Sequence, residues 1–185
     1  SLPDDTAYII MELLRGEPLS LRLRNSGGRL PIPDVIRVSR QIASALAATH
    51  AAGIVHRDLK PDNVMLVQDS EVSGGERAKI LDFGIAKLLT EYAGPLAEEF
   101  HTSTGQVLGT ATYMAPEQCK GSGQVSDRAD VYSLGVVMYR MCCGQLPFRA
   151  DGQGEVMAMH IFSTAKPLRE RDPSIPEGLA ELVSR

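Results

Sequence analysis

His56-Arg57-Asp58-Leu59-Lys60-Pro61-Asp62-Asn63 is the stretch that decides the fold and the chemistry of this 185-residue chain. It brings a carboxylate (Asp58), an ammonium group (Lys60) and a carboxamide (Asn63) close together in sequence. A carboxylate can orient a hydroxyl and accept its proton, an ammonium group can neutralise a phosphate oxygen, and an amide oxygen suits a hard metal ion. A polar turn between two short strands is the plainer alternative. However, the five fixed positions of H-R-D-x-K-x-x-N arise by chance in only roughly 6 of 100,000 chains of this length.

The composition is that of an ordinary globular domain. The chain is 43% hydrophobic and 23% charged, and its net charge is −4 from 19 basic and 23 acidic residues. Bulk charge therefore gives no reason to expect a nucleic-acid partner or a membrane surface. No apolar run is long enough to span a membrane, so we expect a cytoplasmic location, while a membrane anchor in a longer parent protein stays open. The three cysteines form no C-x-x-C pair, which favours free thiols that pack as small apolar side chains.

Hydrophobic periodicity predicts short strands around the motif and helices on both sides of it. The expected strands are 7–14, which Arg15-Gly16-Glu17-Pro18 would end, then 54–55, 64–67 and 79–81. The expected helices are 19–23, Pro33 to near Gly53, 126–142, 155–162 and one that begins near Gly178. The helix at 126–142 is apolar on nearly all sides and should lie in the middle of the core. Residues 68–78 are expected to form an exposed hairpin tip, and residues 88–113 a long loop.

Three further segments follow the opening motif along the chain. They are Ile80-Leu81-Asp82-Phe83-Gly84, Gly109-Thr110-Ala111-Thr112-Tyr113-Met114-Ala115-Pro116-Glu117-Gln118, and Asp127-Arg128-Ala129-Asp130-Val131-Tyr132-Ser133-Leu134-Gly135. With the opening motif they resemble the catalytic loop, the metal-binding D-F-G, the A-P-E end of the activation loop and the central helix of protein kinases. The resemblance runs from about Tyr8 to the C-terminus. The Lys60-Pro61 pair is similar to the Ser/Thr-specific pattern, and residues 109–118 with the lead-in 51–55 resemble the eukaryote-like Ser/Thr kinases of bacteria.

The resemblance implies an α+β, protein-kinase-like fold that consists mainly of the helical C-terminal lobe. On this interpretation residues 1–185 are a partial kinase domain. Residues 1–17 would be the last strand of the N-terminal lobe and the hinge. Residues 18–185 would be the C-terminal lobe, truncated before its final helices.

The resemblance also implies a set of catalytic roles. Asp58 would accept the proton of the substrate hydroxyl, and Lys60 would stabilise the transferring phosphoryl group of ATP. Asn63 and Asp82 would bind Mg²⁺, with Mn²⁺ as the alternative cation. Thr110 would hydrogen-bond Asp58 and Lys60.

For the nucleotide, the resemblance implies a gatekeeper at Met11 and backbone hydrogen bonds from Glu12 and Leu14 to the adenine edge. Met65 would lie under the adenine ring, where the plainer alternative is a core methionine. Lys60, Asn63 and Asp82 complete the nucleotide contacts, and Glu17 is a further candidate at the ribose.

Other residues receive structural or regulatory roles from the resemblance. His56 would stack on Phe83, next to Gly84, and Glu117 would pair with an arginine of the closing helices. Asp130 would accept backbone N–H bonds from the catalytic loop, although a first-turn acid that stabilises its helix is an alternative.

Thr102 and Thr104 are candidates for activating phosphorylation, with Arg57 and Lys87 as partners of the phosphate. Two loop threonines on a solvated segment are the competing interpretation. His50, His101 and His160 match no family role and are expected to be solvent-facing or locally bonded.

The chain also departs from the family pattern, because its 185 residues contain neither G-x-G-x-x-G nor a V-A-I-K-like lysine strand. Two functions therefore stay open. The first is an ATP- and Mg²⁺-dependent kinase of protein Ser/Thr residues, seen as a fragment that is inactive alone, with a homodimer for trans-autophosphorylation as a further partner. The second is a pseudokinase or lobe-only binding scaffold. The coding sequence upstream of Ser1 discriminates between them.

Overall fold

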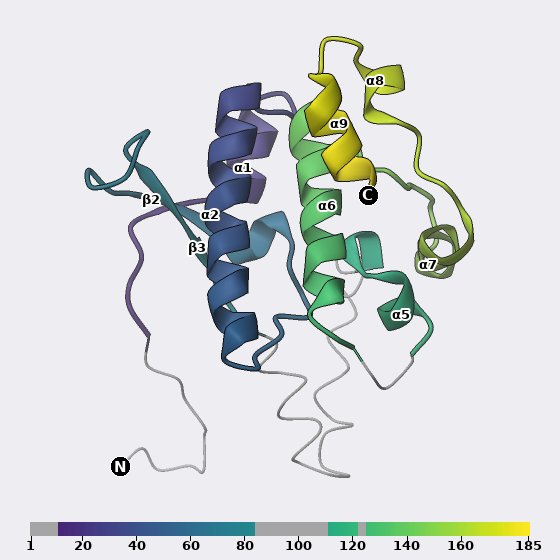
Figure 1. Cartoon of the computed structure of the whole chain (residues 1–185), viewed down its shortest axis with the longest axis horizontal. Coiled ribbons are helices and arrows are strands. Elements are labelled where there is room, and N and C mark those ends of the chain that lie inside the picture. Colours follow the sequence, from purple (N-terminus) through teal and green to yellow (C-terminus); the bar gives the residue numbers. More distant parts are fainter. Residues whose placement is uncertain (1–10, 84–110, 122–124) are drawn as a thin grey trace.

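Two long helices, α2 (Ile32–Ala51) and α6 (Arg128–Cys143), lie side by side at the centre of the fold (Figure 1). The structure is a computed structural model that describes residues 11–83, 111–121 and 125–185. It is an α+β fold in which helices predominate, as expected. A small sheet lies on the α2 side, and the later helices pack on the far side of α6.

Helix α2 forms where the periodicity predicts it. Pro33 lies in its first turn, where a missing backbone N–H costs nothing, and the helix ends at Ala51. Its buried face consists of residues spaced three or four apart, namely Val35, Val38, Ser39, Ile42 and Leu46. This stripe packs against α6 and the sheet, so α2 connects the two halves of the core.

Helix α6 is the most buried element among the described residues. Ten of its residues are buried, from Ala129 to Cys142, as its nearly uniform apolar character predicts. Gly144 ends the helix in the left-handed region at φ 74°, a conformation that glycine adopts without steric cost. Cys142 contributes to the core as an apolar side chain, and burial raises its pKa to about 12. The three cysteines are free thiols.

Within the described residues, the sheet has three antiparallel strands in the order β1-β2-β3. They are β1 (Gly16–Pro18), β2 (Val64–Gln68) and β3 (Glu76–Ile80). Val64 lies opposite Ile80 at one end of the β2–β3 hairpin, and Gln68 lies opposite Glu76 at the other. The hairpin tip is therefore 69–75, shorter than the 68–78 that we expected.

The predicted strand 7–14 is wrong for residues 11–14, which have no regular secondary structure, while residues 7–10 lie outside the described part of the chain. Residues Gly16–Pro18, which we expected to end that strand, instead form the first strand of the described residues. A Cβ at Gly16 would lie 2.1 Å from the carbonyl oxygen of Leu66, so only glycine allows β1 to approach β2 this closely.

The remaining elements surround these two layers. They are α1 (Leu19–Asn25), the 3₁₀ helices η1 (Pro61–Asn63) and η3 (Ala111–Tyr113), α5 (Pro116–Cys119), α7 (Gln153–Phe162), α8 (Leu168–Arg171) and α9 (Glu177–Ser184). The expected helices at 19–23, near 155–162 and from 178 are confirmed. One hydrophobic core runs from Leu19 to Ala180. No helix in the described ranges is both long and apolar enough to cross a membrane.

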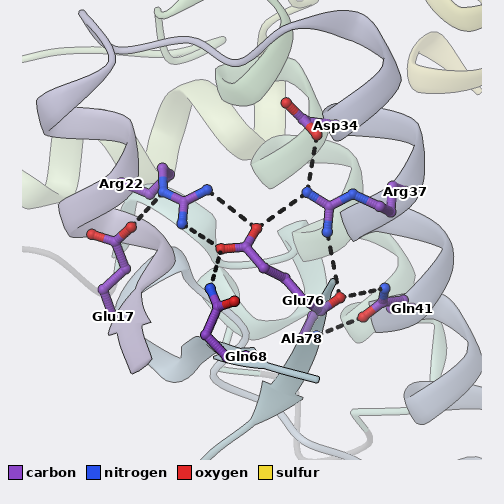
Figure 2. Close-up of polar contacts among 8 residues, drawn as sticks. All are labelled: Glu17, Arg22, Asp34, Arg37, Gln41, Gln68, Glu76 and Ala78. Carbon is purple, nitrogen blue, oxygen red and sulfur yellow. Dashed lines mark hydrogen bonds and ion pairs between the residues drawn. The ribbon is translucent and has the colours of Figure 1, made fainter. Parts of the chain in front are cut away.

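A network of charged side chains holds the tip end of the hairpin against α1 and α2 (Figure 2). Glu76, at the start of β3, accepts hydrogen bonds from Arg22 of α1 (2.6 Å) and Arg37 of α2 (3.3 Å). Glu17 also binds Arg22, and Asp34 binds Arg37 at 2.9 Å. The Arg22 guanidinium is the main reason that the pKa of Glu76 lies below its usual range.

Gln41 of α2 covers the outer edge of β3 (Figure 2). Its amide nitrogen donates to the Glu76 carbonyl at 3.1 Å, and its amide oxygen accepts from the Ala78 N–H at 2.6 Å. The Gln41 side-chain amide thus satisfies backbone groups at the edge of β3 that could otherwise pair with another strand. At the other end of the hairpin, Val64 lies opposite Ile80, and Asn63 and Leu81 just beyond them are hydrogen-bonded through their backbones.

Candidate active site

The segment between α2 and β2 folds around the carboxylate of Asp58. Lys60 Nζ donates to Asp58 Oδ2 at 2.8 Å. Asn63 Nδ2 donates to the Asp58 carbonyl oxygen at 2.8 Å and to Asp58 Oδ2 at 3.1 Å. The structure therefore brings together three of the residues that the sequence singled out, at the tip of a loop that β2 continues.

Asn63 is oriented so that its amide oxygen suits a cation. Both of its hydrogen bonds to Asp58 use the amide nitrogen. The oxygen is a hard ligand of the kind that Mg²⁺ prefers. Asp82 follows a residue that lies next to Asn63 in the fold, because the Leu81 N–H donates to the Asn63 carbonyl at 2.8 Å and continues the β2–β3 pairing beyond Ile80. The amide oxygen and this exposed carboxylate fit a cation that takes its other ligands from phosphate and water.

Asp130, at the start of α6, holds the backbone of the loop in shape. Its side chain is fully buried and accepts the N–H groups of His56 and Arg57, each at 2.8 Å, one on each oxygen. Arg57 lies at φ 67°, in the left-handed region that side chains other than glycine seldom adopt. The carboxylate thus stabilises a strained turn directly before Asp58.

His50 is a third donor to this carboxylate, and sequence reasoning did not identify that role. His50 Nε2 lies 2.7 Å from Asp130 Oδ2. The two residues are far apart in sequence, and no local pattern around His50 distinguishes it from an ordinary residue near the end of a helix. Only the packing of α2 on α6 brings them together.

His56 connects the loop to the strand that precedes Asp82. Its Nε2 lies 2.8 Å from the Leu81 carbonyl, and its Nδ1 accepts the Asp58 N–H at 3.2 Å. A carbonyl only accepts and an N–H only donates, so the ring is neutral with its proton on Nε2. The ring centroids of His56 and Phe83 are 4.9 Å apart at an interplanar angle of 58°, so the two rings are in contact but tilted rather than stacked in parallel. The His56 ring therefore connects the backbone of Asp58 to the backbone of Leu81.

The residues implied for the nucleotide lie along the sheet side of the loop. Met11 and Glu12 are exposed, Leu14 is half-buried, and Glu12 pairs with Lys79 at 2.6 Å. Met65 lies on β2, opposite Lys79 of β3 and Pro18 of β1. Glu17, the candidate for a ribose contact, accepts a hydrogen bond from Arg22.

The segment from 111 to 118 contacts the loop through Gln118. Gln118 Nε2 donates to the Arg57 carbonyl at 2.7 Å, and Gln118 Oε1 accepts the Ala115 N–H at 3.0 Å. Glu117 precedes Gln118 in the first turn of α5. Four residues with proposed regulatory or structural roles, Gly84, Lys87, Thr102 and Thr104, lie outside the described residues, as does Thr110.

His160 of α7 contradicts the expectation of a solvent-facing side chain. It is 4% exposed and contacts Tyr132 and the carbonyl of Thr112, which is distant in sequence. The sequence carried no signal for these contacts, since α7 is apolar on several sides and its histidine matches no motif.

Comparison with known proteins agrees with this geometry. The protein kinase domain pattern matches residues 2–185. The chain belongs to the protein kinase family. Serine/threonine-protein kinase PknA of Mycobacterium tuberculosis is 43% identical over 178 residues, which cover 96% of this chain and 37% of PknA. Serine/threonine-protein kinase Pkn1 of Myxococcus xanthus is 40% identical over 96% of this chain and 24% of its own length.

A probable serine/threonine-protein kinase of Clostridium perfringens is 36% identical over 98% of this chain and 24% of its own length. This kinase-family chain therefore spans between about a quarter and two fifths of the length of these bacterial relatives. The family resemblance that the four motifs predicted is thereby established.

Proposed function

We propose that residues 1–185 supply the catalytic residues of an ATP- and Mg²⁺-dependent protein serine/threonine kinase. The observation that carries this proposal is the cluster of Asp58, Lys60 and Asn63, in which one carboxylate binds both an ammonium group and a carboxamide. A pseudokinase or binding scaffold has no need of this arrangement. The similarity to relatives named serine/threonine-protein kinases supports the same function.

In the proposed reaction, Asp58 orients the hydroxyl of a substrate Ser or Thr and accepts its proton as the oxygen attacks the γ-phosphorus of ATP. Lys60 lies next to Asp58 and neutralises charge that develops on the transferred phosphoryl group. The bond between the γ-phosphorus and the bridging oxygen breaks, and ADP leaves. Because the transition state is loose, the main contributions of the protein are positioning and charge stabilisation.

Asn63 and Asp82 are the proposed metal residues, with Mg²⁺ or Mn²⁺ as the cation. A divalent ion at this place would neutralise the phosphate oxygens and hold them in line. On the sheet side, the backbone of Glu12 and Leu14 and the side chains of Met11 and Met65 would receive the adenine. Thr110 would complete the catalytic set by binding Asp58 and Lys60.

The proposed kinase needs a glycine-rich loop and a phosphate-binding lysine, and neither motif occurs in the 185 residues. A chain that joins both to residues 1–185 is called the extended kinase below. Within it, residues 1–17 would end the N-terminal lobe and residues 18–185 would belong to the C-terminal lobe. Its substrates would be cytoplasmic proteins, and phosphorylation of Thr102 and Thr104 between two copies would order the loop through Arg57 and Lys87.

The test is a substitution of Asp58 by Asn in the extended kinase. We expect Asp58→Asn to lower the rate of phosphoryl transfer at least about 100-fold, the effect of a general base, with an ATP affinity within about twofold of wild type. The matched control is Asp62→Asn, which removes the same charge from an exposed position of the same loop and should keep the activity. Equal activity of the two variants would contradict the proposal, as would a loss of ATP affinity that parallels the loss of rate.

A further inference from the structure

The buried histidine of α7, His160, is a titratable group that the proposed reaction does not use. Its side chain lies between α6 and η3 and makes edge-to-face contacts with the rings of Phe148 (centroids 4.9 Å apart) and Tyr132 (5.6 Å). A buried imidazole costs free energy unless both of its nitrogens are satisfied. The partners of those nitrogens therefore indicate what the residue does.

The two ring nitrogens have different partners, and this fixes the tautomer. His160 Nε2 lies 3.1 Å from the Thr112 carbonyl oxygen, and Nδ1 lies 2.7 Å from the Tyr132 hydroxyl oxygen. The carbonyl can only accept, so Nε2 carries a hydrogen, and in the neutral ring Nδ1 then accepts from the hydroxyl. Burial lowers the pKa of His160, which agrees with a neutral ring.

The hydrogen bond to Thr112 holds one end of a segment whose other end contacts the catalytic loop. Thr112 belongs to η3, and Ser133 Oγ of α6 donates to the Tyr113 carbonyl at 2.7 Å. After η3, Gln118 contacts the Arg57 carbonyl, one residue before Asp58. In the described part of this segment, α7 supports the backbone through the hydrogen bond from His160 to the Thr112 carbonyl.

This segment and the proposed nucleotide residues belong to opposite sides of the α2–α6 pair, because Figure 1 shows the sheet beside α2 and the helices α5 and α7 beyond α6. Met65 belongs to the sheet, and Asp82 directly follows β3. The segment 111–118 instead packs on α6 and α7. A hydroxyl that attacks the γ-phosphorus in line must approach from the side that the nucleotide does not occupy, which is the side of this segment.

We propose that His160 is a positioning residue for the protein substrate, because its Nε2–H bond to the Thr112 carbonyl holds segment 111–113 where that substrate reaches Asp58. The proposal rests on the proposed kinase function. It predicts that loss of this bond weakens binding of the protein substrate and leaves binding of ATP unchanged. A residue that only stabilised the fold would affect both together.

The kinetic test compares His160→Leu with His160→Gln in the extended kinase. Leucine fills the site without a donor, whereas glutamine keeps an N–H donor near the position of Nε2. We expect His160→Leu to raise KM for the protein substrate about fivefold, the effect of one lost hydrogen bond, and to leave KM for ATP within about twofold. His160→Gln should recover most of the loss. Equal changes in both KM values, or no difference between Leu and Gln, would overturn the proposal.

A second measurement does not depend on kinase activity. In the 185-residue chain, ¹⁵N NMR of the imidazoles distinguishes the Nε2–H tautomer from the Nδ1–H tautomer and from the charged ring. We expect the Nε2–H form for His160, and substitution of Tyr132 by Phe should shift the Nδ1 resonance. The Nδ1–H form or a charged ring at neutral pH would overturn the inference even if the extended kinase is active. An inactive extended kinase with the expected tautomer would instead contradict the proposed function and, with it, the substrate role of His160.

Discussion

Arg57 shows how a single buried carboxylate can maintain a strained backbone. Its φ of 67° is unfavourable for a residue with a Cβ, and the Arg57 N–H donates to Asp130 at 2.8 Å. The same carboxylate accepts from the His56 N–H and from His50. The conformation that presents Asp58 therefore depends on a residue of α6 that lies far away in the sequence.

We expect Asp130→Asn to lower the free energy of unfolding by about 2–3 kcal/mol, because an amide cannot accept at both of its atoms and a hydrogen bond to a charged acceptor contributes about 1.5–3 kcal/mol. Urea unfolding of the 185-residue chain measures this. Asp127→Asn is the control, since the Asp127 side chain is exposed and makes no cap hydrogen bond. It should cost less than about 1 kcal/mol. Equal losses in the two variants would mean that the carboxylate of Asp130 does not support the loop.

The buried imidazole of His160 should make the stability of the chain depend on pH. Burial lowers its pKa in the folded state, so the unfolded chain takes up a proton more readily near the ordinary histidine value of about 6.5. The free energy of unfolding should therefore fall as the pH decreases below about 6.5, until the folded state also binds the proton. The facing groups keep their protons over this range, because burial raises the pKa of Tyr132 to about 12 and also raises that of Cys119.

Urea unfolding between pH 7.5 and 5.5 tests this dependence in wild type and in His160→Gln. The variant lacks the titrating group, so its stability should vary less with pH, while Glu117, which lies near Tyr132, is present in both chains. Identical pH dependence in the two chains would show that His160 is not protected from protonation by the fold.

At the scale of elements, the β2–β3 hairpin is held at both ends. The end proposed to hold the metal carries Asn63 and Asp82, and the tip end carries Glu76 with its two arginines (Figure 2). The Glu76 side chain is only 12% exposed, so this cluster is less screened by solvent than a surface ion pair. The pose of the hairpin against α1 and α2 therefore depends on a charge that sequence reasoning did not single out.

Substitution of Glu76 by Gln should lower the free energy of unfolding by about 1–3 kcal/mol at pH 7, because two guanidinium groups lose a charged acceptor. Since the folded-state pKa of Glu76 is lowered, this stabilisation is present above its ordinary value of 4.5 and is lost as the pH falls further. Glu12→Gln is the control, because the Glu12 side chain is 70% exposed and its pair with Lys79 should contribute less than about 1 kcal/mol. An effect of Glu76→Gln no larger than that of the control would contradict the account of the hairpin.

The elements that the sequence predicted correctly are those with strong local periodicity. Val35, Val38, Ile42 and Leu46 follow helical spacing, and they form the buried face of α2. Strand β1 could not be predicted in this way. Glycine and proline disfavour strands on average, yet Gly16 is needed for the close approach to Leu66, which lies in a different part of the chain.

The residues of the candidate site also fall into a group that the sequence predicts and a group that it does not. Asp58, Lys60 and Asn63 were predictable because their chemistry is encoded in one short motif. The supporting contacts of His50, Gln118 and His160 could not be predicted, because each contact joins residues 48 or more positions apart in the sequence. A side chain whose partner is chosen by tertiary packing leaves no local pattern to detect.

At the scale of the whole molecule, we propose that residues 1–185 supply the catalytic loop of the extended kinase and need its glycine-rich loop and phosphate-binding lysine for activity. Positioning of reactants can contribute roughly 7–11 kcal/mol to a rate enhancement. The glycine-rich loop and the lysine would supply much of that positioning for the phosphates. The intact cluster around Asp58 should therefore be insufficient on its own.

Transfer of radiolabelled phosphate from [γ-³²P]ATP to a generic protein substrate, followed by phosphoamino-acid analysis, tests this claim most directly. With Mg²⁺ present, the extended kinase should yield phosphoserine and phosphothreonine, its Asp58→Asn variant should yield neither above background, and residues 1–185 alone should show no transfer. Absence of transfer by a folded extended kinase, or transfer that survives Asp58→Asn, would contradict the account.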